Sequence, residues 1–254
     1  MLVEDGQWII RGLGWDDPYR IRTWKELVNW VNEVGFLPLF SNEIEGFSAE
    51  EHVSPNFWWT GDREQDPWEW REIIAASHEV AYGKFFDKKA GFISRSWLPY
   101  FANSRRCGYD FDARWEDGLA SRREKTIMDF FVEEEDGGTV FKDTHILSTD
   151  LKKQAGFGKG GLKNYPGVIT DLQMQTYLVI SDFKRRVNKK GEEYGMAVSI
   201  LLPPEKLWGY DAVTGAYSEK PSRSWERLTE RVKELYPHAA DADIVRLIGK
   251  RPEE

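Results

Sequence analysis

Residues 148–156 read STDLKKQAG, residues 158–163 read GKGGLK and residues 166–177 read PGVITDLQMQTY. The first run predicts a short helix over residues 149–155, because Ser148 is a helix-capping residue and Gly156 a helix-ending one. The second run is rich in glycine and lysine and predicts a turn. The third run predicts a helix over residues 166–177, with proline in its first turn and apolar residues on one face.

A long β-hairpin is predicted directly after these two helices. Residues 178–187 read LVISDFKRRV, residues 188–191 read NKKG and residues 196–201 read MAVSIL. Two runs rich in β-branched residues, separated by a turn sequence, are typical of a hairpin. Helix, turn, helix and long hairpin is the element order of a winged helix. The sequence therefore predicts a winged-helix domain over residues 141–202.

The remaining elements are predicted from helix caps, periodicity and turns. They are a helix from the capping box of Thr23 and Glu26 to Gly35, a helix from Pro67 towards His78, a hairpin over residues 81–94, a helix from Ser121 through Phe131, and helices around 224–235 and 241–248. We expect an α+β fold with a winged helix-turn-helix module and additional helices and β-hairpins. Residues 1–140 form an acidic, tryptophan-rich N-terminal region, winged-helix-like by analogy, and residues 203–254 supply packing helices.

Composition limits the class of protein. The chain has 254 residues, of which 41% are hydrophobic and 12 are tryptophan, so it can bury a sizeable core and is not expected to be disordered. A lone cysteine, Cys107, excludes an internal disulfide and a thiolate-rich metal site. No apolar run is long enough to span a bilayer, and residues 1–6 do not resemble a secretion signal. We expect a soluble, cytoplasmic protein with no membrane partner.

Charge is unevenly distributed along the chain. The whole protein has a net charge of −8, which argues against a surface that is basic throughout. Residues 142–200, however, contain ten Lys and Arg against six Asp and Glu, so this segment carries +4 and the remainder −12. A basic module in an acidic chain predicts double-stranded DNA as the partner.

Nine cations surround the predicted winged helix and are the candidate DNA-binding residues. They are Lys152 and Lys153 on the first helix, Lys159 and Lys163 in the turn, and Lys184, Arg185, Arg186, Lys189 and Lys190 on the hairpin. In helix-turn-helix proteins the second helix enters the major groove, where a glutamine can pair with adenine, so Gln173 is a candidate base reader. The alternative is that the lysine-rich hairpin tip is only a solvated turn.

Several segments resemble a known group of proteins. The arrangement LSTDLK at 147–152, AGF at 155–157 and ITDLQ at 169–173, ahead of a hairpin, resembles the winged-helix proteins related to the bacterial DNA glycosylases AlkZ and YcaQ. This resemblance implies a DNA-repair setting and tandem winged helices. It also implies a Gln-x-Gln triplet that positions the hydrolytic water. Gln173 and Gln175 match that triplet in letters, although the family's triplet lies in the N-terminal part.

Other residues suit base excision without being selected by spacing. Glu43 and Glu45 lie in the loop after the first predicted helix and are candidate catalytic carboxylates. A flipped base would need stacking surfaces, which Trp58, Trp59 and Trp68 could supply. The four histidines are too far apart to place two ligands on one helical face, so we expect no metal and no cofactor.

Two further functions stay open from the sequence. The winged helix could be a non-enzymatic module that binds DNA or docks another protein, since this fold serves both purposes. Alternatively, the chain could be a small-molecule enzyme or sensor with an aromatic pocket in the N-terminal region. A tryptophan-lined cavity remote from the basic hairpin would favour that second alternative.

Overall fold

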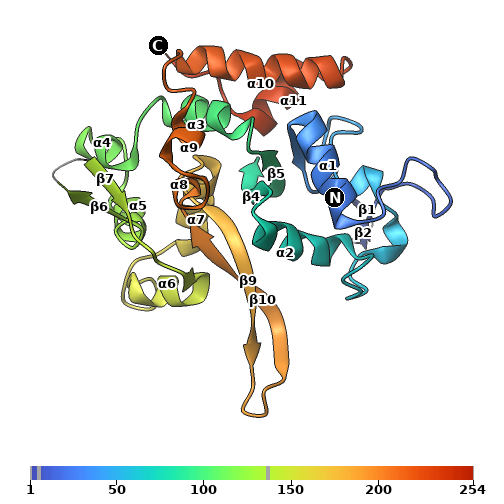
Figure 1. Cartoon of the computed structure of the whole chain (residues 1–254), viewed down its shortest axis with the longest axis horizontal. Helices are drawn as coiled ribbons and strands as arrows, with labels where there is room; N and C mark the ends of the chain where they lie inside the picture. Colours follow the sequence, from blue (N-terminus) through green and yellow to red (C-terminus); the bar gives the residue numbers. More distant parts are fainter. Residues whose placement is uncertain (1, 5–6, 136–137, 254) are drawn as a thin grey trace.

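An antiparallel six-stranded sheet organises the molecule (Figure 1). The computed structural model describes residues 2–4, 7–135 and 138–253. The strands lie in the order β3 (Phe36–Pro38), β5 (Lys89–Ser94), β4 (Val80–Phe86), β9 (Val179–Val187), β10 (Glu193–Leu202) and β8 (Ile146–Leu147). Helices pack around this sheet, so the predicted α+β class is confirmed.

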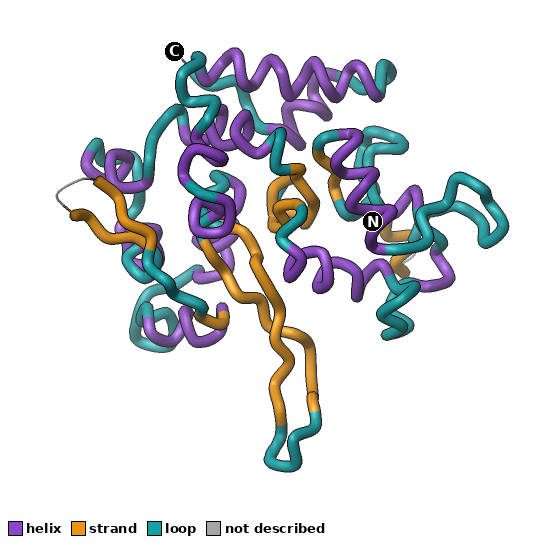
Figure 2. The backbone as a smooth tube through the Cα atoms, viewed as in Figure 1, coloured by secondary structure: helices purple, strands orange, loops and turns teal. Residues whose placement is uncertain are grey.

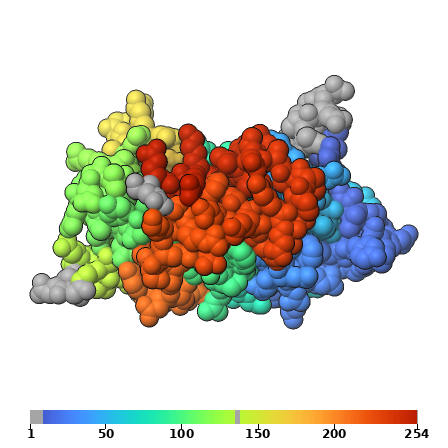
Figure 3. All heavy atoms as spheres, turned by 90° about the horizontal axis from the view of Figure 1, so that it is seen from above, coloured from blue at the N-terminus to red at the C-terminus, as the bar shows by residue number. Residues whose placement is uncertain are grey.

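The first hydrophobic core lies on the β3–β5–β4 half of the sheet. Its helices are α1 (Trp24–Val34), α2 (Pro67–Ser77), α3 (Leu98–Arg106), α10 (Pro221–Leu235) and α11 (Asp241–Ile248), with single turns of 3₁₀ helix at Glu50–His52 and Pro55–Phe57. Seen from the α10 side, the C-terminal segment lies between the N-terminal part and the part around α4 and α5 (Figure 3). In the described residues, no helix combines the length and apolar character needed to cross a membrane.

The second hydrophobic core lies between the β9–β10–β8 half of the sheet and the helices around it. The elements beside it are α4 (Phe111–Glu116), α5 (Arg122–Met128), α6 (Ser148–Gln154), α7 (Tyr165–Met174) and the β6 (Val132–Glu135) to β7 (Gly138–Phe141) hairpin. Short elements complete the chain, namely β1 (Leu2–Glu4), β2 (Gln7–Ile9), α8 (Pro204–Trp208) and α9 (Tyr210–Thr214). Ile180 on β9 packs against both cores and so connects them.

The predicted helices form, with shifts at their ends. Ser148 is the first residue of α6 and not its cap, because its hydroxyl accepts a 3.2 Å hydrogen bond from the Ser199 hydroxyl on β10. α7 ends at Met174, three residues before the predicted end. α5 ends at Met128 and not at Phe131, because the amides of Phe130 and Phe131 bond carbonyls only three positions back.

Strand β4 joins the two halves of the sheet at a narrow point. It pairs with β9 at a single register position, Tyr82 opposite Ile180. Beyond that pair α7 packs against β4, and the Gln173 side chain accepts a 3.0 Å hydrogen bond from the backbone amide of Lys84. A side chain from α7 therefore satisfies a β4 amide where no strand does.

Gly35, at the end of α1, has a backbone conformation that other residues adopt only under strain. Its φ is +100°, and a β-carbon there would lie 2.6 Å from Nε1 of Trp97. We expect Gly35→Ala to lower the free energy of unfolding by about 1–3 kcal/mol, measured by urea titration. Gly118→Ala is the control, since Gly118 has φ +70° but open space around it. Equal losses in the two variants would contradict the predicted clash with Trp97.

Candidate nucleic-acid interface

The β9–β10 hairpin extends far beyond the rest of the molecule (Figure 2). Four cations on it are exposed, namely Lys184, Arg186, Lys189 and Lys190. Apolar side chains are exposed beside them, namely Val187, Tyr194 and Met196, the last with 84% of its surface accessible. The hairpin therefore presents positive charge together with apolar groups.

Four more cations lie on α6 and the turn that follows it. Lys152, Lys153, Lys159 and Lys163 are all exposed. α6 packs against β10, so these residues belong to the same part of the molecule as the root of the hairpin. We call the four hairpin cations and these four the basic set. Within the described residues, none of its eight members forms an ion pair.

The structure gives two of the predicted DNA contacts partners within the fold. Arg185 points back to α2, where its guanidinium donates to both carboxylate oxygens of Glu69, at 2.9 and 3.1 Å. Its charge is therefore neutralised within the fold. Gln173 is only 2% exposed, and its amide is hydrogen-bonded to the Lys84 amide and the Ile169 carbonyl. Because β4 covers this part of α7, the Gln173 side chain is enclosed within the fold.

The other catalytic candidates are not brought together. Gln175 donates a 2.9 Å hydrogen bond to Glu124 in an open pocket beside α5. Glu43 forms an ion pair with Arg246 on α11, and Glu45 is exposed in the same loop. Neither glutamate is hydrogen-bonded to Gln175, and Gln173 is enclosed. In the described part of the chain, no group of three or more His, Cys, Asp or Glu is placed to hold a metal ion.

A cleft of about 490 Å³ lies at the root of the hairpin. α2 supplies Trp68 and Arg71, β4 supplies Tyr82, β9 supplies Phe183, and Phe40 comes from the loop after β3. Mostly apolar side chains of β9 and β10 form the opposite wall. The small-molecule alternative from the sequence would be favoured by an aromatic cavity remote from the hairpin. This cleft, in contrast, lies beside the hairpin.

Charged groups form the inner wall of this cleft. The Arg71 guanidinium lies 3.8 Å from the ring centre of Trp68 and 4.7 Å from that of Phe183, and it donates a 3.0 Å hydrogen bond to Glu72. Burial raises the pKa of Glu72, although the charges of Arg71 and Arg185 oppose that shift. Burial likewise raises the pKa of Tyr82. The two aromatic rings and the ion pair with Glu72 therefore hold Arg71 in place.

The tryptophans singled out from the sequence have different surroundings. Trp68 lines the cleft, with its ring 6.4 Å from Phe40 and 6.5 Å from Trp59. Trp58 is buried. Trp59, whose φ is +61°, is nearly half exposed on a loop. Asp66 holds that loop by accepting hydrogen bonds from the amides of Trp59, Gly61 and Trp68. The aromatic groups thus continue from the cleft to the surface.

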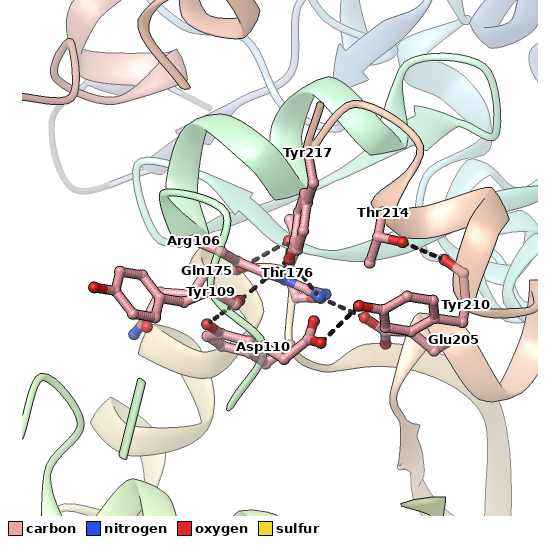
Figure 4. A network of polar contacts seen from close by, with 10 residues as sticks. Arg106, Tyr109, Asp110, Gln175, Thr176, Glu205, Tyr210, Thr214 and Tyr217 are labelled. Atoms are coloured by element: carbon pink, nitrogen blue, oxygen red, sulfur yellow. Dashed lines mark hydrogen bonds and ion pairs between the residues drawn. The ribbon is translucent and has the colours of Figure 1, made fainter. Parts of the chain in front are cut away.

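A second polar cluster is structural. Arg106, only 1% exposed, pairs with the buried Glu205 and donates to the Thr176 carbonyl at 2.6 Å (Figure 4). Tyr210 donates a 2.7 Å hydrogen bond to Asp110 in the same cluster. These residues connect α3, the segment between α7 and β9, α8 and α9. Because their polar groups bond one another, we assign the cluster to stability and not to ligand binding.

Comparison with known proteins places this architecture in a family. A family model described as AlkZ related matches residues 21–249. No curated protein matches the chain, and neither does any solved structure. The match runs through nearly all of the chain, so it includes the basic set and the cleft. The resemblance inferred from the sequence is confirmed: the chain belongs to the AlkZ-related family and is thereby related to AlkZ- and YcaQ-type glycosylase-like proteins.

Proposed function

We propose that the protein binds duplex DNA through a winged-helix module built from α5, β8, α6, α7, β9 and β10. The order of these elements supports the proposal, since a three-helix unit followed by a hairpin is how winged helix-turn-helix proteins are arranged. β8 pairs with β10, and β10 with β9, so the three strands form one sheet beside α6 and α7. This module lies within the residues that match the family model.

The main support for the proposal is that the cations of the basic set are exposed and unpaired among the described residues. Some exposed arginines elsewhere on the surface are paired with carboxylates, as Arg223 is with Glu226 and Arg246 with Glu43. The eight cations of the basic set have no such partners among the described residues. Unpaired cations gathered on one module of an acidic protein suit the phosphates of a nucleic acid.

Phosphate contact, more than base reading, is what this surface supports. The covered face of α7 includes Thr170 and Gln173, and its exposed Asp171 would repel a phosphate. Contacts to phosphate fix position and carry no sequence information. We therefore propose binding with little sequence preference, and we assign no hydrolytic step to Gln173 and Gln175.

The apolar side chains of the hairpin fit the same proposal. Many proteins that bend DNA insert an apolar side chain between base pairs from the minor groove. Val187, Tyr194 and Met196 are exposed on the hairpin next to the cations, where the duplex would lie. Such a wedge would favour DNA that is already unpaired or easily unstacked.

The first test is duplex binding across a salt series. Its variant replaces the four hairpin cations Lys184, Arg186, Lys189 and Lys190 by alanine. Each lost phosphate contact makes the log–log dependence of affinity on salt less steep by about 0.9. We expect a steep slope for the wild type and a slope less steep by about 2–3.6 for the variant, measured by fluorescence anisotropy.

The control variant removes the same number of exposed cations from the other end of the molecule. It replaces Lys25, Lys233, Lys250 and Arg251 by alanine. This control should retain the wild-type slope, because these residues lie on α1, on α10 and in the C-terminal segment, away from the hairpin (Figure 1). Absence of salt-dependent affinity in the wild type, or equal slopes in both variants, would contradict the proposal.

A further inference from the structure

We propose that the cleft at the root of the hairpin binds one unpaired nucleotide, with its base against the aromatic wall and its phosphate on three lysines at the rim. This inference deepens the proposed function and in part rests on it, because the β9–β10 hairpin forms one wall of the cleft. The recognised chemistry is a flat heterocycle joined to a phosphate. A free nucleotide and an unpaired nucleotide in DNA both supply it.

The aromatic wall suits a flat ring. Phe40 and Trp68 lie with ring centres 6.4 Å apart and a shallow angle of 32° between their planes. Both are partly exposed, as is Phe183 on β9. Every base has a π-face, so stacking on such side chains is strong and tolerant of base identity. The volume of about 490 Å³ lies in the usual range for small-ligand sites.

Arg71 makes this wall rigid. It is nearly buried, and the rings of Trp68 and Phe183 enclose its guanidinium. Its ion pair with Glu72 leaves the group fixed in a conformation that needs no rearrangement when a ligand enters. The guanidinium thus positions Trp68 and Phe183 for stacking on a ligand.

Three lysines supply positive charge at the rim. Lys84 on β4, Lys88 in the β4–β5 turn and Lys89 at the start of β5 all line the cleft and are exposed. None of them forms an ion pair with another described residue, and Lys84 Nζ has only Thr170 Oγ1 at 3.5 Å. Lys88 has φ +63°, a conformation that lysine rarely adopts. Uncompensated cations beside an aromatic wall match a phosphate joined to a base, and an apolar metabolite would not need them.

The cleft adjoins the proposed DNA-binding hairpin, so it is not an isolated nucleotide pocket. Phe183 on β9 and Ser199 on β10 belong both to the cleft and to the hairpin that carries exposed Val187 and Met196. A duplex held on the hairpin with one base displaced would place that base near the cleft. Displaced bases cost least when they are already unpaired.

The test compares three probes by fluorescence. They are free deoxyadenosine monophosphate, a duplex carrying one unpaired aminopurine, and the same duplex fully paired. Two variants address the cleft, Trp68→Leu for stacking and Lys84→Ala/Lys89→Ala for charge, and the second changes exposed side chains only. Lys25→Ala/Lys233→Ala is the matched control.

We expect the wild type to bind the unpaired duplex about tenfold or more tightly than the paired one, with quenching of the aminopurine. Both cleft variants should lose that preference while still binding the paired duplex, and the control should keep it. A wild type that binds the paired duplex without preference, and does not bind the mononucleotide, overturns the cleft inference and leaves the proposed function standing. A preference retained in both cleft variants also overturns it.

The two proposals can fail separately. Binding of the mononucleotide that depends on Trp68 and on Lys84 and Lys89, without any duplex binding, would support the cleft with a free nucleotide as its ligand. That same outcome would overturn duplex binding at the hairpin.

Discussion

Replacement of Arg106 by methionine is expected to lower the free energy of unfolding by about 3–5 kcal/mol, because it leaves the Glu205 carboxylate buried without its partner. Burial opposes the positive charge of Arg106, but Glu205 and the neighbouring tyrosines outweigh it and raise its pKa. The side chain also donates to the carbonyl of Thr176. Its loss would therefore leave several buried acceptors unsatisfied at once.

Urea unfolding followed by tryptophan fluorescence measures this loss. The matched control is Arg246→Met, since Arg246 pairs with Glu43 and both side chains are nearly half exposed. Exposed ion pairs contribute about 0–1 kcal/mol, so the control should unfold close to the wild type. Adding Glu205→Leu to Arg106→Met should restore part of the loss, because the unpaired carboxylate is then removed. Equal midpoints for Arg106→Met and the wild type would contradict a stabilising role for the pair.

Shortening the hairpin is expected to weaken duplex binding about 60-fold at 0.1 M salt, if both lysines of its tip contact phosphate. The change replaces the five residues 188–192 with Asn-Gly. Val187 and Glu193 lie directly opposite each other, so a two-residue turn can join them. The deletion removes Lys189 and Lys190 together with the exposed turn that carries them.

The fold should tolerate this deletion. The hydrogen bonds that the structure shows for residues 188–192 stay within that turn, for example from the amide of Lys190 to the side chain of Asn188. We therefore expect the urea midpoint to stay within the error of the wild type. A full-length variant with Lys189→Ala and Lys190→Ala separates charge from hairpin length. Wild-type affinity in the shortened protein at low salt would remove the hairpin tip from the interface.

Local signals in the sequence predict much of the secondary structure. Thr23 and Glu26 form the start of α1, and the capping box of Ser121 and Glu124 is complete at the start of α5. The residues of such a signal are neighbours, so their geometry follows from the helix alone. The hairpin predicted over residues 81–94 forms for the same reason, around a two-residue turn.

Contacts between distant segments are what the sequence does not reveal. Gln173 is a candidate base reader from its place on the second predicted helix, but β4 covers its side chain, and the bond to the Lys84 amide spans 89 positions. Arg185 is paired with Glu69, 116 positions away. No periodicity or cap signals either contact, because both depend on how the halves of the sheet meet.

The sequence likewise does not reveal the cleft, apart from the pair Trp68 and Arg71. Its walls come from α2, β4, β9, β10 and the loop after β3, so no short motif describes it. Trp68 is a stacking candidate from the sequence, whereas Tyr82 and Phe183 are not distinguished from core aromatics. Arg71 follows Trp68 by three positions on a helix, which places a guanidinium near the ring, and that spacing is the signal available beforehand.

The edges of the sheet have a consequence for aggregation. One edge strand, β3, has three residues and ends in Pro38, and the other, β8, has two residues, so neither offers a long row of free backbone groups. The projecting half of the hairpin is different, because, among the described residues, β4 pairs with β9 only at Ile180 and β8 pairs with β10 only at Ile200 and Leu201, so both outer edges are open beyond these residues. Lysine on an open strand edge opposes pairing with a second copy. The hairpin cations thus also protect against edge-to-edge aggregation, and alanine in their place removes that protection together with the phosphate contacts.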